Sequence, residues 1–386
     1  MRVLQIHNRY KKRGGEESVV EEEKAILEKN GHQVFQFIKD SSEIDNYSKA
    51  KLIGLLFKQR ESKQITNELK QFIIDCKPDI CHVHNVYPII SPVVFTVCNS
   101  MGIPVVQTLH NYKMVCTNSL LFREGEVCEL CLNKSLYNSI KYKCYRNSYI
   151  TTAVQADTIE YHRKNETWNE RVDRYICLTD FQKAKLISGG MPKEKMAVKP
   201  NFIKRIDLEV SYENFFLFVG RLDNSKGLAD LLYLFEHNTS TKFVLIGESD
   251  SPEVFKSFKN VEYLGKQDRA EVYGYLSRCK AVIFPSKYYE GMPMVILESF
   301  ALKKAVIARN VGAMSSMISN NLNGVKYEHS NELVELISEL DKDEERLRAL
   351  GNNAYNSFVE KYNDMIGYQN LIELYSDVLK QKENGL

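Results

Sequence analysis

Two consecutive series of strand-like and helix-like segments run through the chain, and this alternation constrains the fold more than any other sequence feature. Short runs rich in β-branched and aromatic residues alternate with stretches of helical periodicity roughly 10–15 residues long. Such alternation predicts parallel sheets covered by helices. Strands are expected at 3–7, 33–38, 79–84, 104–110, 174–179 and 197–202, then at 215–219, 243–247, 261–264, 281–285 and 305–308. Helices are expected at 18–29, 228–236, 270–279 and 293–302, and the tail 352–383 reads as helical.

The two series predict two domains. The chain has 386 residues, and a single domain usually holds about 100–200. The polar stretch 204–214 is the candidate linker. We therefore expect a Rossmann-like domain at 1–203 with an insert at 113–147, and a second Rossmann-like domain at 204–386 whose last helix packs back on the first. Ligands of such sheets bind at the carboxyl ends of the strands, so we expect a site in the cleft between the domains.

Charge and composition exclude some classes of protein. The 52 Lys and Arg against 50 Asp and Glu give a net charge of +2, which argues against a general nucleic-acid binder. The first residues are too short an apolar run for a signal peptide, and no stretch approaches the roughly 18 apolar residues of a membrane span. We expect a cytoplasmic protein, in which the nine cysteines do not form a disulfide framework.

Cations follow the first strand of the second series. Gly220 and Arg221 come directly after the strand at 215–219, and Lys226 lies five residues after Arg221, followed by Gly227. Arg presents a fork that fits phosphate oxygens, and Lys presents a compact charge. The alternative is an ordinary solvated loop.

A second loop follows the strand at 281–285. Gly291 permits a tight turn, and Pro293 suits the first position of a helix, whose free N–H groups favour phosphate. Glu290 precedes the turn, and Glu298 lies in an apolar helical run where a carboxylate needs a partner or a ligand. A cap or a surface ion pair would also satisfy Glu298.

These two loops together resemble the retaining glycosyltransferases of the GT-B fold, family 4. Seven residues separate Glu290 from Glu298, and the loop 220–227 has the family's Gly-Arg and Lys-Gly pattern. The order and spacing also match at 199–201, at Gly265 and at 270–279, so the resemblance covers nearly the whole chain. It implies transfer of a sugar from a nucleoside-diphosphate sugar, a UDP-sugar being the commonest, to an acceptor hydroxyl with retention, and without a catalytic metal.

The resemblance also implies roles for individual residues. Arg221 and Lys226 would bind the donor diphosphate and stabilise charge on the leaving group, and Glu298 would hold the ribose hydroxyls. Glu290 would contact the donor sugar. The donor-binding backbone would come from Gly291, Met292, Pro293 and Met294, with Lys266 near the base.

In the first domain the resemblance points to two further places. Gly14 and Gly15 match the family's glycine loop beside the phosphate and the acceptor, and Glu16 would face the acceptor. His110, at the end of the strand 104–110, matches the family's active-site histidine and would contact the transferred sugar. The alternative for His110 is a packed, hydrogen-bonded residue.

Four cysteines lie within the insert. Cys116, Cys128, Cys131 and Cys144 have the spacing of a thiolate site, and the polar segment has few apolar residues with which to fold alone. We interpret them as a structural zinc site. An iron–sulfur cluster and four free thiols are the alternatives.

The acceptor is expected to be a cell-surface polysaccharide or other glycan, on a lipid carrier in many relatives. The run 49–60, with Arg9, Lys11, Lys12 and Arg13, would give a basic apolar face for peripheral contact with the inner face of the membrane. A helix packed on the sheet is an equal alternative. Other functions left open are a sugar-nucleotide epimerase, a phosphorylase and a non-catalytic binding protein. The alternative of a nucleic-acid-binding zinc protein would be supported by the four cysteines alone.

Overall fold

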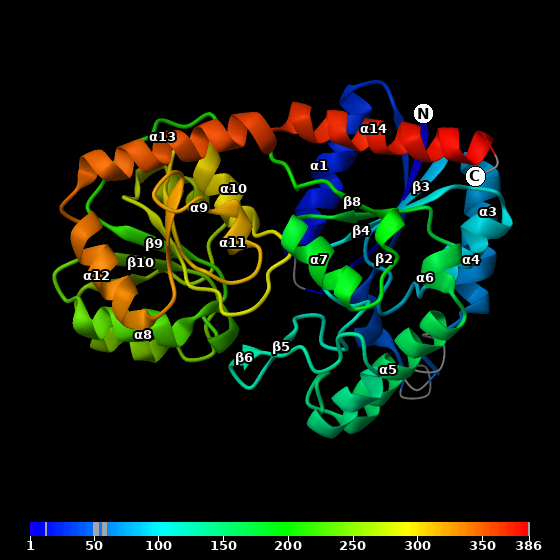
Figure 1. Ribbon diagram of the computed structural model, residues 1–386, viewed down its shortest axis with the longest axis horizontal. Coiled ribbons are helices and arrows are strands. Elements are labelled where there is room, and N and C mark those ends of the chain that lie inside the picture. Colours follow the sequence, from blue (N-terminus) through cyan, green and yellow to red (C-terminus); the bar gives the residue numbers. More distant parts are fainter. Residues whose placement is uncertain (12–13, 49–53, 56–59, 385–386) are drawn as a thin grey trace. The chain divides into compact units, whose positions relative to one another are not determined.

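The computed structural model describes residues 1–11, 14–48, 54–55 and 60–384. The chain divides into two compact units. Unit 1 comprises Met1–Leu121, Cys128–Asn201 and Gly367–Leu386, and unit 2 comprises Phe122–Val127 and Phe202–Ile366. Both chain termini therefore belong to unit 1 (Figure 1).

Unit 1 is built on a six-stranded parallel sheet of order β2-β1-β3-β4-β7-β8. The strands β3 and β4 are buried along their whole length, which is typical of parallel strands covered on both faces. The chain passes from β1 to β2 on one side and to β3 on the other, so the carboxyl ends of β1 and β3 form the switch point where such sheets bind ligands. The strands are β1 (Arg2–Arg9), β2 (Gln33–Asp40), β3 (Ile80–Val83), β4 (Val105–Leu109), β7 (Arg174–Cys177) and β8 (Met196–Val198).

The helices of unit 1 include one from the far end of the chain. Leu371, Tyr375 and Val378 of α14 (Asp364–Glu383) pack in one apolar cluster with strand residues such as Val3 and Val106. This packing brings the C-terminal helix onto the sheet of unit 1 (Figure 1). The other helices are α1 (Gly15–Lys29), α3 (Lys63–Cys76), α4 (Val93–Ser100), α5 (Tyr149–Lys164), α6 (Thr167–Glu170) and α7 (Asp180–Ser188), with 3-10 turns η1 (Ser41–Asn46), η2 (Leu136–Tyr142) and η3 (Lys193–Lys195).

Unit 2 contains a second six-stranded parallel sheet, of order β11-β10-β9-β12-β13-β14. Helices α8 and α12 pack together, as do α10 and α13, on opposite sides of the strands (Figure 1). The strands are β9 (Phe216–Val219), β10 (Phe243–Ile246), β11 (Val261–Tyr263), β12 (Val282–Phe284), β13 (Val306–Arg309) and β14 (Gly324–Tyr327). The helices are α8 (Leu228–His237), α9 (Arg269–Arg278), α10 (Met294–Ala301), α11 (Met314–Met317), α12 (Ser330–Leu340) and α13 (Glu344–Lys361), with η4 (Asn224–Lys226) and η5 (Pro252–Ser257). The short hairpin β5 (Phe122–Arg123) and β6 (Glu126–Val127) also groups with this unit.

Three local features differ from the sequence predictions. The strand expected at 197–202 ends at Val198, because Pro200 has no N–H to continue the ladder. Strand β14 was not anticipated. The helical tail is two helices, since the chain breaks at Tyr362 and the Asn363 side chain accepts a 3.0 Å hydrogen bond from the backbone N–H of Ile366 at the start of α14.

Candidate active site

Two loops of unit 2 pack against each other at the carboxyl ends of β9 and β12. Gly227 has a φ of +82°, and a Cβ there would lie 2.1 Å from the carbonyl oxygen of Pro285. The backbone N–H of Lys287 donates a 2.9 Å hydrogen bond to the carbonyl of Ser225. Glycine at 227 is therefore required for this close approach of the loops 220–227 and 285–293.

This approach brings Lys226 and Glu290 together. The Lys226 ammonium donates to Glu290 Oε1 at 2.5 Å. Ser286 donates to the same oxygen at 2.8 Å, and the Tyr288 hydroxyl donates to Oε2 at 2.7 Å. Glu290 is buried, and a buried carboxylate of this kind needs such partners. The carboxylate is thus held rigidly beside the cation.

Arg221 is much more open to solvent than Lys226. Its side chain is 60% exposed and lies 3.3 Å from Asp223. Asp223 is also the cap of η4, where its Oδ1 accepts from the backbone N–H groups of Ser225 and Lys226. An exposed ion pair contributes little stability. The Arg221 guanidinium can therefore turn to an anionic ligand at small cost.

Helix α10 begins next to this pair with no side-chain hydrogen bond at its N-cap Pro293 from any described residue. Uncapped N–H groups at a helix start favour an anion. Glu298 lies one turn into the helix, where its Oε1 accepts from the Tyr273 hydroxyl at 3.2 Å and lies 3.8 Å from Arg269. Burial raises the pKa of Glu298, and Arg269 and Tyr273 oppose this rise.

The remaining residues that were predicted to bind the donor have differing surroundings. Met292 and Pro293 are buried, while Gly291 and Met294 are partly exposed. Lys266 is exposed and lies 3.2 Å from Glu248, so its side chain is engaged at the surface.

In unit 1 the glycine loop leads into α1, whose N-cap is Gly14. Glu17 accepts from the backbone N–H groups of Tyr10 and Gly14, which with the His7 contact holds its pKa at about 2 despite burial. Burial and the neighbouring Glu17 charge raise the pKa of Glu16 to about 8. The carboxyl of Glu16 is therefore neutral at pH 7.

His110 directly follows β4 and is partly exposed, at the outer end of a buried chain of polar groups. Its Nε2 lies 3.0 Å from Nδ1 of His84, and Nε2 of His84 lies 3.5 Å from Oε2 of Glu23. The other oxygen of Glu23 accepts from the Lys199 ammonium at 2.7 Å. Burial is the largest cause that lowers the pKa of His110, to about 3, so this imidazole is neutral at pH 7.

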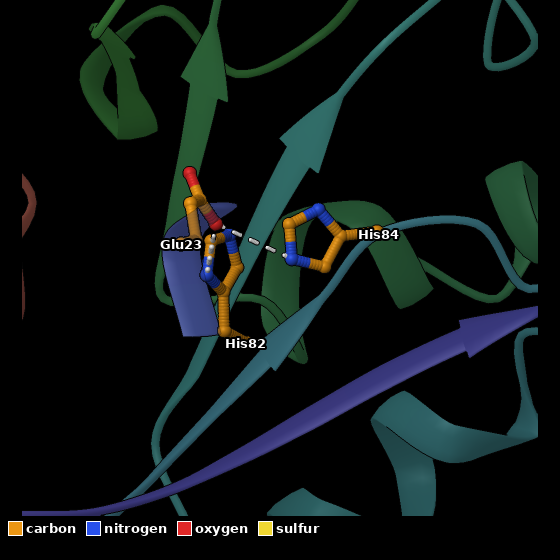
Figure 2. A group of neighbouring side chains, drawn as sticks. All are labelled: Glu23, His82 and His84. Carbon is orange, nitrogen blue, oxygen red and sulfur yellow. Dashed lines mark ion pairs between the residues drawn. The ribbon is translucent and has the colours of Figure 1, made fainter. Parts of the chain in front are cut away.

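Figure 2 shows Glu23 facing both His82 and His84, and the potential ligand atoms of these three residues lie within 4.8 Å of one another. The spacing would suit a metal ion, but the surroundings do not. His82 Nε2 is 2.7 Å from Thr108 Oγ1, and its Nδ1 is 2.7 Å from the Tyr375 hydroxyl. A buried ammonium already neutralises Glu23 and would repel a divalent cation. We therefore describe the group as a hydrogen-bonded network.

This network was not among the sequence predictions, although the sequence holds two signals for it. Alternate residues of a strand share a face, which places His82 and His84 on the same side of β3. The buried positions of α1 are Glu17, Val19, Val20, Glu23, Ile26 and Leu27. Glu23 thus falls on the apolar stripe of the helix at the i, i+3 spacing from Val20 and Ile26.

All nine cysteines are free thiols, and the four of the insert belong to unit 1. Cys116 and Cys131 are buried, whereas Cys128 and Cys144 are partly exposed. Burial raises the pKa of Cys131 to about 12, and the nearby thiols of Cys116, Cys144 and Cys128 add to this rise. Within the described part of the chain, only Glu23, His82 and His84 meet the 4.8 Å spacing, so the four sulfurs do not.

The expected membrane face cannot be followed in the structure, since 12–13, 49–53 and 56–59 lie outside the described residues. Of its other cations, Lys11 forms an ion pair with Asp45. None of the described helices combines the length and apolarity that crossing a bilayer requires.

Both halves of the chain match known protein families. Residues 13–205 match the family model described as Glycosyltransferase Family 4, and residues 201–357 match the one described as Glycosyl transferases group 1. An uncharacterized glycosyltransferase of Methanocaldococcus jannaschii is 27% identical over 333 residues, which are 81% of this chain and 87% of that protein.

Two further proteins extend the comparison. The N,N'-diacetylbacillosaminyl-diphospho-undecaprenol alpha-1,3-N-acetylgalactosaminyltransferase of Campylobacter jejuni is 33% identical over 145 residues, 36% of this chain and 38% of that enzyme. The crystal structure of Anabaena HepE in complex with UDP and glucose is similar with a TM-score of 0.69 at 15% identity, and the match covers 98% of this chain and 100% of HepE. At that identity the likeness concerns the fold alone, and it confirms the expected GT-B class with its two parallel sheets.

Proposed function

The chain belongs to glycosyltransferase family 4, and on this premise we propose that it transfers a sugar from a UDP-sugar to a hydroxyl of a glycan acceptor, with retention at the anomeric carbon. The family match and the named relatives make it a glycosyltransferase of polysaccharide or glycan biosynthesis. The UDP-sugar donor, the retention of stereochemistry and the glycan acceptor go beyond the family match and are our proposal.

The observation that carries the proposal is the ion pair of Lys226 with the buried Glu290, beside the exposed Arg221 and the uncapped start of α10. Two cations and free N–H groups suit a diphosphate, whose charge grows as the bond to the sugar breaks. In our proposal Arg221 and Lys226 hold this diphosphate. Glu290, fixed by Ser286 and Tyr288, contacts the donor sugar.

Glu298 is proposed to bind the ribose hydroxyls. Its carboxylate is mostly buried, and among the described residues its partners are Tyr273 and the more distant Arg269. A buried carboxylate with spare acceptor capacity suits two vicinal hydroxyls. The backbone of 291–294 and the region of Lys266 complete the donor site in this proposal.

Unit 1 is proposed to supply contacts with the transferred sugar and the acceptor. His110 is neutral at pH 7 and partly exposed, so it can exchange hydrogen bonds with a sugar hydroxyl. Glu16, with a pKa of about 8, can donate a hydrogen bond to an acceptor oxygen, beside the backbone of Gly14 and Gly15. No catalytic metal takes part, because cations and helix N–H groups of the chain carry the charge of the phosphates.

The choice of UDP and of a glycan acceptor is supported by the relatives. HepE was crystallised with UDP and glucose, and the Campylobacter enzyme is named for transfer to a sugar linked to diphospho-undecaprenol. We propose an acceptor of the same class, a cell-surface glycan built on a lipid carrier.

We also propose that the four cysteines of the insert bind a structural zinc ion. Support comes from their spacing in the sequence and from the other three thiols adding to the rise in the pKa of Cys131. Zinc would displace the thiol protons and draw the sulfurs to about 2.3 Å from the metal, a closer set than the present one.

The test of the donor site is a thermal-shift series with UDP, GDP and their sugars. Wild type is compared with Arg221→Ala and Glu298→Ala, and Arg205→Ala is the control, since Arg205 is an exposed arginine outside the site with a 3.5 Å ion pair to Asp207. We expect stabilisation by UDP compounds that both site variants lose and the control keeps. If both site variants kept the ligand-induced rise in melting temperature, or if no ligand stabilised the wild type, the proposed site would be contradicted. Stabilisation by GDP compounds alone would contradict the choice of UDP.

Product analysis by NMR then tests the chemistry. If the donor has an axial anomeric bond, an axial glycosidic bond in the product would support retention, and an equatorial one would refute it. Conversion of the donor sugar without an acceptor would indicate an epimerase instead.

A further inference from the structure

The buried chain from Glu23 through His84 to His110 fixes where hydrogen atoms can lie. Glu23 and His84 are buried, with 0% and 3% of their surface exposed, and His110 is the end that reaches solvent. Oε2 of Glu23 lies 3.5 Å from Nε2 of His84, and Nδ1 of His84 lies 3.0 Å from Nε2 of His110. Each contact can carry one hydrogen, so the direction at one end determines the direction at the other.

At the inner end the direction follows from the charge of Glu23. An ionised carboxylate only accepts hydrogen bonds, and the charge of Lys199 lowers the pKa of Glu23 against the effect of burial. Lys199 occupies Oε1. Neither Oε2 of Glu23 nor Nε2 of His84 makes a hydrogen bond to a described residue, and the two atoms face each other at 3.5 Å.

His82 does not compete for this place. It also lies 3.5 Å from Glu23 Oε2, but its two ring nitrogens have 2.7 Å contacts with Tyr375 and Thr108. The hydrogen facing Oε2 must then come from Nε2 of His84. The reverse arrangement would set a nitrogen lone pair of His84 against the carboxylate, which is electrostatically unfavourable.

We propose that Glu23, acting through His84, holds His110 in the neutral tautomer protonated at Nε2, so that its Nδ1 is a bare hydrogen-bond acceptor. With its proton on Nε2, His84 has a lone pair on Nδ1 and accepts from Nε2–H of His110 across 3.0 Å. Nδ1 of His110 is left with a lone pair. The hydrogen bond at one ring nitrogen of a histidine determines which of its two nitrogens is protonated. For His110, Glu23 determines the direction of that hydrogen bond through His84.

The functional consequence rests on the proposed function, in which His110 contacts the transferred sugar. A bare Nδ1 accepts from a sugar hydroxyl and cannot donate to a ring or phosphate oxygen. Glu23 and His84 are therefore positioning residues that select the orientation of a donor-sugar hydroxyl. Lys199 contributes by keeping Glu23 charged and by occupying its second oxygen.

The tautomer can be measured without any activity. The chain has eight histidines, and the full-length protein labelled with ¹⁵N-histidine gives long-range ¹H–¹⁵N correlations in which protonated and bare ring nitrogens differ widely in shift. His110→Gln identifies the signals of His110. We expect a proton on Nε2 and none on Nδ1 at pH 7. A proton on Nδ1, or on both nitrogens, would overturn the proposal.

Glu23→Gln gives a directional test. In this variant Lys199 still favours the amide oxygen of the glutamine, so the amide NH₂ turns toward His84. The NH₂ then donates to Nε2 of His84. The whole chain should reverse, and the His110 proton should move to Nδ1. Glu28→Gln is the matched control on the same helix, because Glu28 is exposed and has only a 3.9 Å pair with Lys24. A folded Glu23→Gln protein with an unchanged His110 tautomer would refute the relay, and if this variant does not fold, the wild-type spectrum alone decides.

Kinetics separate this inference from the proposed function. We expect Glu23→Gln to lower kcat for sugar transfer at least tenfold while the Kd for UDP changes less than twofold, since UDP lacks the sugar. Unchanged kcat in a variant whose tautomer has reversed would contradict the role in sugar orientation. A wild-type protein that binds no nucleotide and transfers no sugar would refute the proposed function, whereas the tautomer assignment would still be decided by NMR.

Discussion

Lys226 and Glu290 form a 2.5 Å ion pair although they are separated by a long stretch of sequence. Their loops follow β9 and β12, which are neighbours in the sheet of unit 2. The carboxyl ends of neighbouring parallel strands meet at one edge, so the pair is a direct result of strand order. Its charges are balanced when no ligand is bound, and an incoming diphosphate offers Lys226 a second anion.

Lys226→Met should reduce sugar transfer strongly. It removes a cation that stabilises the leaving diphosphate, and loss of one such group costs roughly 100-fold in kcat. Within the part of the chain that the structure describes, it also leaves the buried Glu290 with the Ser286 and Tyr288 hydroxyls as its hydrogen-bond donors. Steady-state kinetics should show the loss in kcat, and the exposed Lys256→Met serves as control. A variant with normal kcat would contradict the role of Lys226.

Gly227→Ala should disrupt the donor loops. A Cβ would meet the Pro285 carbonyl oxygen at 2.1 Å, and the φ of +82° is unfavourable for alanine. We expect a loss of unfolding free energy of about 2–4 kcal/mol and no UDP binding. Gly125→Ala is the control, since Gly125 also has a positive φ, of +87°, but no atom within 4 Å of the added Cβ. Equal effects of the two changes, measured by urea unfolding, would show that strain and not the loop contact matters.

Glu298→Ala should distinguish ribose from phosphate recognition. If Glu298 holds the ribose, the variant loses about 1–3 kcal/mol of UDP binding but keeps its affinity for inorganic pyrophosphate. Isothermal titration with both ligands measures this. Parallel weakening for UDP and pyrophosphate would mean that Glu298 supports the loops instead.

The sheets and the positions of the loops 220–227 and 285–293 could be predicted because their signals are local. Apolar runs, glycine turns and the Pro293 start of α10 are each read from a few adjacent residues, and the strands of both sheets were found except β14. That strand is only Gly324–Tyr327, begins with glycine and includes Lys326, so it lacks the apolar run on which the prediction relied.

The buried network of unit 1 could be predicted only in part, because its members come from separate parts of the chain. The place of Glu23 on the apolar stripe of α1 indicates that its side chain is buried, but it does not indicate which residues that side chain meets. Its partner Lys199 lies beyond β8, and Tyr375, which bonds His82, lies on the last helix. Such pairings depend on the tertiary fold and not on local propensity.

Loss of zinc should unfold the insert if our metal proposal holds. Elemental analysis of the purified, reduced protein should give about one zinc per chain, and Cys131→Ser should lose both the metal and thermal stability. Cys98→Ser is the control, as Cys98 is buried but lies on α4 outside the insert. Iron with visible absorption would indicate a cluster. No metal in the wild type would refute the site.

Stability should depend on pH through Glu16. Its pKa is about 8 in the folded protein against an ordinary value of 4.5, so between these pH values the folded state keeps a proton that the unfolded chain releases. The contribution of Glu16 is therefore complete below pH 4.5 and is lost as pH rises to about 8. The neighbouring Glu17, with a pKa of about 2, acts oppositely, since its contribution is lost as pH falls from 4.5 through 2.

Glu16→Gln removes the loss of stability that accompanies ionisation of Glu16 at high pH, because the amide stays neutral at every pH. Urea unfolding should show the variant more stable than wild type by about 1–3 kcal/mol at pH 8, and the difference should shrink toward zero near pH 5. Glu28→Gln, on the exposed side of the same helix, should show no such trend. A difference between Glu16→Gln and wild type that stays constant from pH 5 to pH 8 would mean that Glu16 is ionised in the folded protein, and its proposed hydrogen bond to the acceptor would then fail as well.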